Sequence, residues 1–220
     1  MMNIDWNTLR ALGGSQRNAF EELCCQLAAY EPAPTESRFI RVGAPDAGVE
    51  CYWILPQGDE WAWQAKYFTA TPNKTQWGEV DESVRTALEK HPRLVRYTIC
   101  FPVDRADPRR KNEQWFMDKW HQHVAKWKGW AQEKGMSVEF DYWGEHDLLV
   151  SLSQEEHRGR FFFWFHRELF SDRWFQERMD EAIGGAGPRY TPNLNVDLPI
   201  ARLFDGLGRT TFRNFAIRSS

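Results

Sequence analysis

The sequence predicts an α/β fold in which helices flank a mixed β-sheet. Apolar residues recur at helical spacing in several segments, and short segments between them alternate apolar with polar residues as β-strands do. A hairpin followed by strand–helix–strand succession combines antiparallel and parallel strands in one sheet. The helical segments lie around residues 15–30, 80–88 and 112–134, and the clearest alternation lies at 49–55 and 61–68.

Length and composition restrict the class of protein. The chain has 220 residues, enough for one full domain with an appendage or for two very small domains, and we favour the first. Its hydrophobic share of 42% and charged share of 27% indicate a folded chain rather than a disordered one. The formal net charge of -3 argues against a surface coated with basic residues for unselective nucleic-acid binding, but it leaves a local basic cleft open.

The first helix is predicted to begin after Ser15, a residue type that caps helices well. Phe20, Leu23 and Cys24 belong to its apolar face. Glu21 falls at the edge of that face, where its carboxylate could lean over the edge of a buried sheet. The alternative is an ordinary solvated glutamate. Two prolines, at 32 and 34, end the helix.

A central hairpin is predicted next, after a short strand at residues 38–42. Its two strands flank a turn at residues 56–60. If Leu55 pairs with Trp61, Glu50 lies opposite Lys66 and Tyr52 lies opposite Gln64, all on one face. An acid, an amide and a lysine would then converge on one spot of a sheet that is otherwise apolar.

The middle of the chain alternates loops, helices and strands. Residues 69–78 are predicted to form a polar loop, followed by a helix that ends near His91 and Pro92. The segment 94–104 is apolar on both faces, which is typical of a central strand. Two sets of basic residues are candidates for contact with DNA phosphates, although solvated loop residues are the alternative. They are Lys74 in the first loop and Arg105, Arg109 and Arg110 in a charged loop at 104–111.

The last predicted elements begin with a long helix over residues 112–134, which Gly135 ends. Its tryptophans lie at core spacing, which favours a core or subunit interface over a surface for stacking bases. A strand at 136–143 completes a parallel crossover. A short helix, an apolar segment and a helix capped by Ser171 follow, and from Gly184 onward the sequence is rich in Gly, Pro and Asn.

The cysteines, the histidines and the N-terminal residues argue against other classes of protein. The four cysteines form no CxxC pair, so we expect free, buried thiols in a reducing cytosol. The six histidines are scattered without the spacing of zinc ligands, which disfavours a zinc-dependent hydrolase. The N-terminal residues are polar and no segment is apolar enough to span a membrane. These observations predict a cytoplasmic protein without a membrane partner.

The hairpin residues suit phosphodiester hydrolysis. That reaction needs a divalent ion to bind a phosphate oxygen and activate water, and a cation to orient the water. Glu50 and the backbone carbonyl of Ala65 would hold Mg²⁺, with Mn²⁺ as the alternative ion, and Gln64 would add an amide oxygen. Lys66 would face the attacking water. We expect Asp46 as a further metal contributor and Glu21 as an outer catalytic residue.

The order of these motifs resembles the Mrr-like branch of the PD-(D/E)xK nuclease superfamily. There a helix with a Phe-Glu pair precedes a Gly-Val-acid strand and a Gln-x-Lys strand. The corresponding residues here are Phe20-Glu21, the segment 46–50 (DAGVE) and Gln64-Ala65-Lys66. The chain differs in having Glu at position 50, where Asp is commoner, and Ala at position 47, where Gly is frequent. The resemblance implies a restriction-endonuclease-like fold and metal-dependent cleavage of double-stranded DNA.

The C-terminal segment extends the resemblance. A module of this size followed by YTPNLNVDLPI is similar to the N-terminal effector of antiviral STAND NTPases, which act in bacterial anti-phage defence. It implies a nuclease domain at 1–183 and a connector at 184–220 that leads to downstream NTPase and sensor domains. It also implies self-association of the nuclease domains as dimers or tetramers. No phosphate-binding loop of the GxxxxGK[ST] type occurs in these residues.

Two functions therefore stand against each other. The first is a Mg²⁺-dependent DNA endonuclease. The alternative is a catalytically degenerate nuclease fold that serves as a DNA-binding or oligomerisation module. Loss of cleavage on substitution of Lys66 or Glu50 would separate an enzyme from a binding module.

Overall fold

The computed structural model describes residues 4–43, 48–104, 116–166 and 172–186. The chain divides into two units, Met1–Arg167 and Glu168–Ser220. In the second unit the described element is helix α6, Asp172–Ala186. The predicted boundary between a nuclease domain at 1–183 and a connector at 184–220 stays a prediction.

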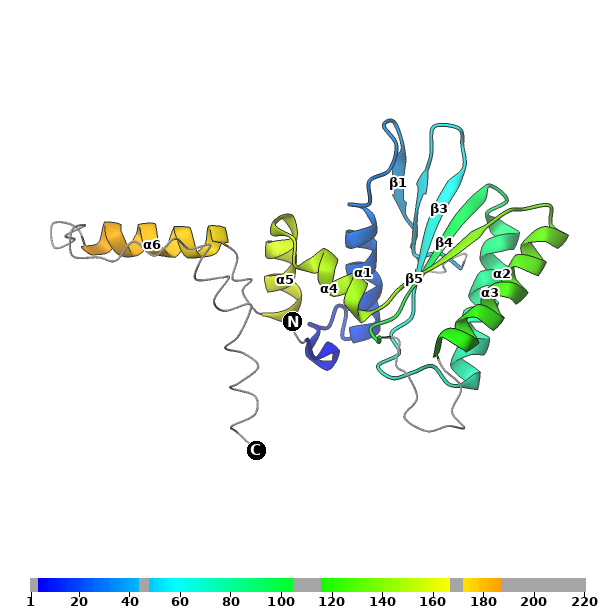
Figure 1. Cartoon of the computed structure of the whole chain (residues 1–220), viewed down its shortest axis with the longest axis horizontal. Helices are drawn as coiled ribbons and strands as arrows, with labels where there is room; N and C mark the ends of the chain where they lie inside the picture. The colour runs from blue at the N-terminus through cyan, green and yellow to red at the C-terminus, as the bar shows by residue number, and fades with distance from the viewer. Residues whose placement is uncertain (1–3, 44–47, 105–115, 167–171, 187–220) are drawn as a thin grey trace. The chain divides into compact units, whose positions relative to one another are not determined.

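The first unit alternates helices and strands around one sheet (Figure 1). Its elements in chain order are η1 (Trp6–Thr8), α1 (Gln16–Ala28), β1 (Arg38–Arg41), β2 (Cys51–Ile54), β3 (Glu60–Ala65), α2 (Lys74–Lys90), β4 (Leu94–Cys100), α3 (Phe116–Glu133), β5 (Glu139–Trp143), α4 (Glu145–Leu152), η2 (Glu155–His157) and α5 (Arg158–Phe165).

The sheet is mixed, with the strand order β1-β2-β3-β4-β5. The pairs β1/β2 and β2/β3 are antiparallel, whereas β3/β4 and β4/β5 are parallel. Helix α1 lies on one side of the sheet and the α2–α3 pair lies on the other (Figure 1). This arrangement confirms the predicted α/β class, a mixed sheet flanked by helices as in the restriction-endonuclease-like fold.

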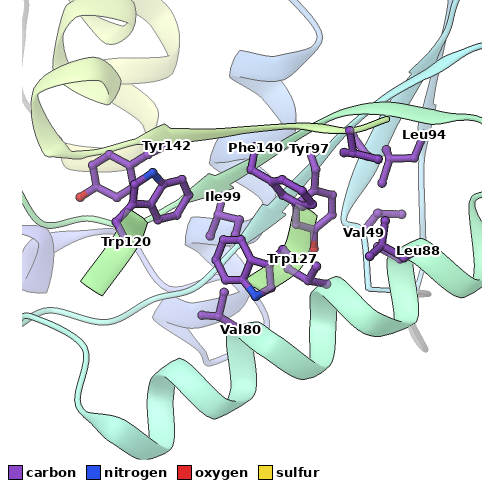
Figure 2. Close-up of a cluster of buried hydrophobic side chains, with 14 of the residues drawn as sticks. Val49, Val80, Leu88, Leu94, Tyr97, Ile99, Trp120, Trp127, Phe140 and Tyr142 are labelled. Atoms are coloured by element: carbon purple, nitrogen blue, oxygen red, sulfur yellow. The ribbon is translucent and has the colours of Figure 1, made fainter. Parts of the chain in front are cut away.

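The core between the sheet and the α2–α3 pair is rich in aromatic residues. Trp127 of α3 is fully buried and lies between Val80 of α2 and Phe140 of β5 (Figure 2). Its ring centroid is 5.5 Å from that of Phe140. Tyr97 and Ile99 of β4 close the sheet side of the same core. The high Trp and Phe content thus fills the interior, where such rings bury a large apolar area.

Helix α1 forms as its local sequence predicts. The Ser15 side chain accepts a hydrogen bond from the Asn18 backbone N–H at 3.3 Å, which makes Ser15 the N-cap. The predicted apolar face, including Phe20 and Leu23, is buried. The C-terminal Ala28 carbonyl accepts a bond from the Trp53 indole at 2.8 Å, which ties the helix to β2.

The four cysteines are free and buried, as predicted. Burial raises the pKa of the Cys24 thiol, and a hydrogen bond with Cys100 raises it further. Burial, together with a hydrogen bond to Cys25, likewise raises the pKa of the Cys51 thiol. Both thiols therefore stay protonated at neutral pH and act as small apolar residues between α1 and the sheet.

Helix α2 begins earlier than predicted, so the prediction of a polar loop through residue 78 is wrong. The Asn73 side chain accepts hydrogen bonds from the N–H groups of Thr75 and Gln76, and the Gln76 side chain bonds back to Asn73. This reciprocal capping box starts the helix at Lys74. Lys74 is exposed in the first turn, and its predicted contact with DNA stays a prediction.

An aspartate on α2 fastens α3 in place. Asp81 accepts hydrogen bonds from His123 Nδ1 at 2.8 Å, Lys126 Nζ at 2.6 Å and Trp127 Nε1 at 2.7 Å. Burial alone would raise the pKa of the Asp81 carboxyl, but these hydrogen bonds outweigh it and lower the pKa below its usual value. The carboxylate is thus a fixed link between the two helices that cover one face of the sheet.

Replacing Asp81 with asparagine is expected to lower the free energy of unfolding at pH 7 by about 1–3 kcal/mol, because charged donors lose a charged acceptor. A carboxyl whose pKa is depressed by folding stabilises the protein above its unfolded-state pKa of about 3.9, and this contribution vanishes as pH falls through the folded-state value. The deficit of the variant should therefore shrink below about pH 4. Urea unfolding from about pH 7 to about pH 3 tests this, with the exposed Asp118→Asn as the control.

The predicted end of the long helix and the predicted parallel crossover are confirmed, whereas the predicted helix start at residue 112 and the predicted Ser171 cap lie outside the described residues. Gly135, at φ 71°, ends α3 in the left-handed conformation, and β5 then pairs parallel to β4. The indole of Trp164 on α5 donates to Gln26 of α1 at 3.0 Å, which packs the end of this unit against its beginning. No helix within the described ranges is long and apolar enough to cross a membrane.

Candidate active site

Glu50 is the residue directly before β2, and both its backbone N–H and its backbone carbonyl form hydrogen bonds to neighbouring segments. Its N–H donates to the Trp63 carbonyl at 2.7 Å, and its carbonyl accepts from the Val42 N–H at 2.9 Å. Two residues earlier, the Gly48 carbonyl accepts a bond from the buried Tyr97 hydroxyl at 2.6 Å. Glu50 itself is only 5% exposed. A carboxylate of this burial needs polar partners, because its ionised form is costly to remove from water.

Gln64 of β3 supplies one partner. Its Nε2 donates to Glu50 Oε1 at 2.6 Å and lies 3.4 Å from the Ala65 carbonyl oxygen. Gln64 is 1% exposed, and its own Oε1 is buried without a hydrogen-bond donor among the residues that the structure describes. A buried amide oxygen without a donor costs stability. Because the side chain is bonded to a carboxylate through Nε2, a turn of the amide would bring this oxygen to the carboxylate as a candidate ligand for a cation.

The predicted hairpin register is wrong by two residues. Cys51 pairs with Trp63 and Ile54 pairs with Glu60, so the next position brings Glu50 opposite Gln64 rather than Lys66. A shift of two preserves the face of every side chain, since the side-chain period of a strand is two. Glu50 and Gln64 therefore share a face as predicted, and Lys66 lies two residues beyond Gln64, just after the end of β3.

The cause of the shift is the turn. The sequence predicts a five-residue turn over 56–60, but the Leu55 N–H donates to the Asp59 carbonyl at 2.8 Å and leaves a loop of only Pro56, Gln57 and Gly58. Gly58 has φ 87°, the left-handed conformation that closes three-residue hairpin loops. Asp59 therefore pairs with Leu55 instead of belonging to the turn, and Glu60 begins β3.

Lys66 follows β3 directly, at the edge of the sheet where β3 and β4 both end. Its N–H donates to the Cys100 carbonyl of β4 at 2.9 Å. The residue is 8% exposed, which is rare for a lysine. Lys66 is two residues beyond Gln64 and directly after the last residue of β3. The prediction that its side chain shares a face with that of Gln64, as strand alternation implies, stays a prediction.

Arg41 of β1 is a site residue that sequence reasoning missed. Its Nη1 donates to the Glu50 carbonyl at 2.7 Å and to the Val42 carbonyl, and lies 3.8 Å from Glu50 Oε2. Its Nε donates to Glu22 Oε2 at 3.3 Å. Glu22, which helical spacing assigns to the solvated side of α1, is thus connected to Glu50 through Arg41. The signal that could have found Arg41 is its antiparallel position opposite Cys51, the neighbour of Glu50.

Glu21 is predicted to lean over the edge of the sheet. Its side chain is 18% exposed, and Oε1 forms an ion pair with Arg17 Nε at 3.0 Å, one turn earlier on α1. The structure thus gives Glu21 a local partner on its own helix. Its participation beside Glu50 and Gln64 stays a prediction.

Several predicted site residues lie outside the described residues. They are Asp46 and the three arginines of the charged loop, Arg105, Arg109 and Arg110. Among the residues that are described, no three His, Cys, Asp or Glu side chains form a group that could hold a metal ion. His123, which lies beside a carboxylate of α2, is bonded to Asp81 as part of the helix contact.

The oxygens in the hairpin fit a hard divalent cation. Glu50 offers a carboxylate and Ala65 offers a carbonyl, and the Gln64 amide now directs its Nε2 at both of these oxygens. Turning that amide by about 180° would exchange Nε2 for Oε1, which is buried without a donor among the described residues, and would complete an all-oxygen set. Mg²⁺ and Mn²⁺ prefer oxygen ligands of these types. The donor set therefore agrees with the ion that the sequence resemblance implies.

Comparison with known proteins adds no relative. No protein-family model matches the sequence, and no curated protein matches it. The function is therefore inferred from the residues of the hairpin and from the resemblance of their motifs.

Proposed function

We propose that this protein is a metal-dependent endonuclease that hydrolyses phosphodiester bonds of double-stranded DNA. The observation that carries the proposal is the buried pair of Glu50 and Gln64, with an amide oxygen that lacks a donor among the described residues. Lys66, also buried, is the residue that directly follows β3. Carboxylate, amide oxygen and ammonium are the groups that this reaction requires.

Each group has a role in the proposed reaction. Glu50 and the Ala65 carbonyl would hold Mg²⁺ or Mn²⁺, and Gln64 would add its Oε1 once the amide turns to present this oxygen in place of Nε2. The bound ion would polarise the phosphate and lower the pKa of a water molecule. The Lys66 ammonium would orient the attacking water and offset the negative charge that develops on the phosphate oxygens. Burial excludes bulk water, which strengthens these electrostatic effects.

Energetics support a functional rather than a structural origin for the cluster. Burying a carboxylate and an ammonium costs several kcal/mol per ion, and an apolar pair of similar volume would stabilise the fold equally well or better. Burying the Glu50 carboxylate and the Lys66 ammonium at one end of the sheet therefore lowers the stability of the fold. Perturbed and costly ionisable groups of this kind gather at active sites.

The wider setting is proposed from the motif resemblance. We propose a Mrr-like PD-(D/E)xK nuclease domain that acts in the cytoplasm as the effector of an anti-phage STAND NTPase. Double-stranded DNA would be the substrate, and the nuclease domains would self-associate when the downstream NTPase and sensor domains respond to their stimulus. Lys74, Arg105, Arg109 and Arg110 are proposed DNA contacts, and Asp46 and Glu21 are proposed contributors to the catalytic site.

Cleavage of supercoiled plasmid tests the function. The full-length protein with its stimulus, or this chain fused to a tetramerising domain, should nick plasmid with Mg²⁺ or Mn²⁺ and be inactive in EDTA. Lys66→Ala should lower the cleavage rate at least about a hundredfold, because the group that orients water is lost. Lys90→Ala, an exposed lysine at the end of α2, should cleave as the wild type does.

Two outcomes would contradict the proposal. One is a Lys66→Ala variant that cuts at the wild-type rate. The other is a clustered wild-type protein that binds duplex DNA but leaves it intact with either ion, which would establish the degenerate binding or oligomerisation module instead.

A further inference from the structure

Arg41 presents a guanidinium group that is fixed in place beside the candidate active site. Backbone carbonyls of Val42 and Glu50 accept hydrogen bonds from Nη1, and the Glu22 carboxylate accepts one from Nε. Three acceptors, one on α1, one directly after β1 and one directly before β2, thus determine where the group lies. Arginine loses less conformational freedom on binding a ligand when its side chain is held in this way.

The other edge of the guanidinium is available. The Arg41 side chain is 38% exposed, and no acceptor in the described part of the chain bonds to Nη2. An arginine that served only to join β1 to β2 and α1 would need only the Nε and Nη1 bonds already made. An edge that carries two N–H groups, with no acceptor among the residues that the structure describes, is instead the geometry that binds a phosphate oxygen.

Arg41 is the positive group between two carboxylates, Glu22 and Glu50. Glu50 Oε2 lies 3.8 Å from Arg41 Nη1, so the guanidinium borders the carboxylate that is proposed to serve the reaction. The carboxylates of Glu22 and Glu50 would repel a DNA strand, and Arg41 is positioned to offset that repulsion. A DNA phosphate that approaches Glu50 would therefore meet the oppositely charged guanidinium of Arg41.

We infer that Arg41 binds a backbone phosphate of the DNA substrate, and that Glu22 is a positioning residue that holds Arg41 for this contact. This inference rests on the proposed function, since it assigns the substrate's path across the same site. It adds a DNA contact on β1 to those proposed on α2 and in the charged loop.

Salt dependence of DNA binding tests the inference. A labelled duplex is titrated with protein in EDTA, so that it is not cut, at several salt concentrations. Arg41→Gln should weaken binding about five- to tenfold at about 0.1 M salt and should reduce the slope of log affinity against log salt by about one, because one phosphate contact is lost. Arg38→Gln, at the exposed other end of β1, should leave both quantities unchanged.

The outcomes separate the inference from the proposed function. If wild type binds duplex DNA and Arg41→Gln keeps the wild-type slope, the inference is wrong and the nuclease proposal is unaffected. If wild type binds no duplex DNA, the proposed substrate is wrong and the inference falls with it. Glutamine reaches only the position of Arg41 Nε and so loses the Nη1 bonds, and circular dichroism verifies that the variant keeps the fold. Should Arg41→Gln unfold, Arg41→Lys, which keeps the charge but not the two-pronged edge, must weaken binding at an unchanged slope.

Discussion

Glu50→Gln is expected to lower metal-dependent DNA cleavage at least about a thousandfold while the protein stays folded. Glutamine has nearly the shape of glutamate and keeps an oxygen that can accept the Gln64 Nε2 bond, now 2.6 Å long. It lacks the negative charge that a divalent ion requires. Because the substitution also removes a charge from a buried position, the free energy of unfolding should change by less than about 1 kcal/mol.

Three measurements on one preparation check this expectation. Calorimetry with Mn²⁺ should detect binding to wild type and none to Glu50→Gln, plasmid nicking should follow the same pattern, and urea unfolding should give similar free energies. Glu60→Gln is the matched control, since Glu60 is a half-buried carboxylate on β3 that pairs with His91 at 2.7 Å, at the other end of the hairpin. Cleavage by Glu50→Gln at within about tenfold of the wild-type rate would remove Glu50 from the active site.

Local signals explain what the sequence could predict. The Ser15 cap and the apolar face of α1 depend on residues within one helix, so helical periodicity located them correctly. The apolar character of both faces of β4 identified it as an interior strand for the same reason. Helix α2 shows the limit of such signals, because its start depended on recognising Asn73 and Gln76 as a capping box in a stretch that reads as a loop.

The candidate site could be predicted only in part. Alternation placed Glu50 and Gln64 on one face, and their hydrogen bond confirms it. Which residues stand opposite each other depended on Gly58, whose left-handed conformation shortens the turn. Arg41 was not found because its approach to Glu50 crosses from β1 to β2, and neither helical nor strand periodicity reports contacts between strands.

Gly48→Ala is expected to destabilise the protein by about 3 kcal/mol or more, the largest loss of stability that we predict. A Cβ at this position would lie 2.3 Å from the Ser83 carbonyl oxygen and 2.8 Å from the Ala87 nitrogen, both backbone atoms of α2. Neither can rotate away, so the helix or the strand entry must move. The φ of 76° adds strain for any residue with a side chain.

Gly48→Ala should also disturb the candidate active site, because the contact of Gly48 with α2 determines the position of the chain just before β2. The Gly48 carbonyl accepts a hydrogen bond from Tyr97, and Gly48 lies two residues before Glu50. A displacement of the backbone at Gly48 would therefore also move the Glu50 carboxylate away from Gln64. Thermal unfolding should therefore show a midpoint lower by roughly 6–12 °C, since about 1 kcal/mol corresponds to roughly 2–4 °C in a domain of this size. Gly43→Ala, at a position with open space for a Cβ and no left-handed φ, should melt with the wild type. An unchanged midpoint in Gly48→Ala would mean that the strand entry and α2 are not in the close contact that holds Glu50 in place.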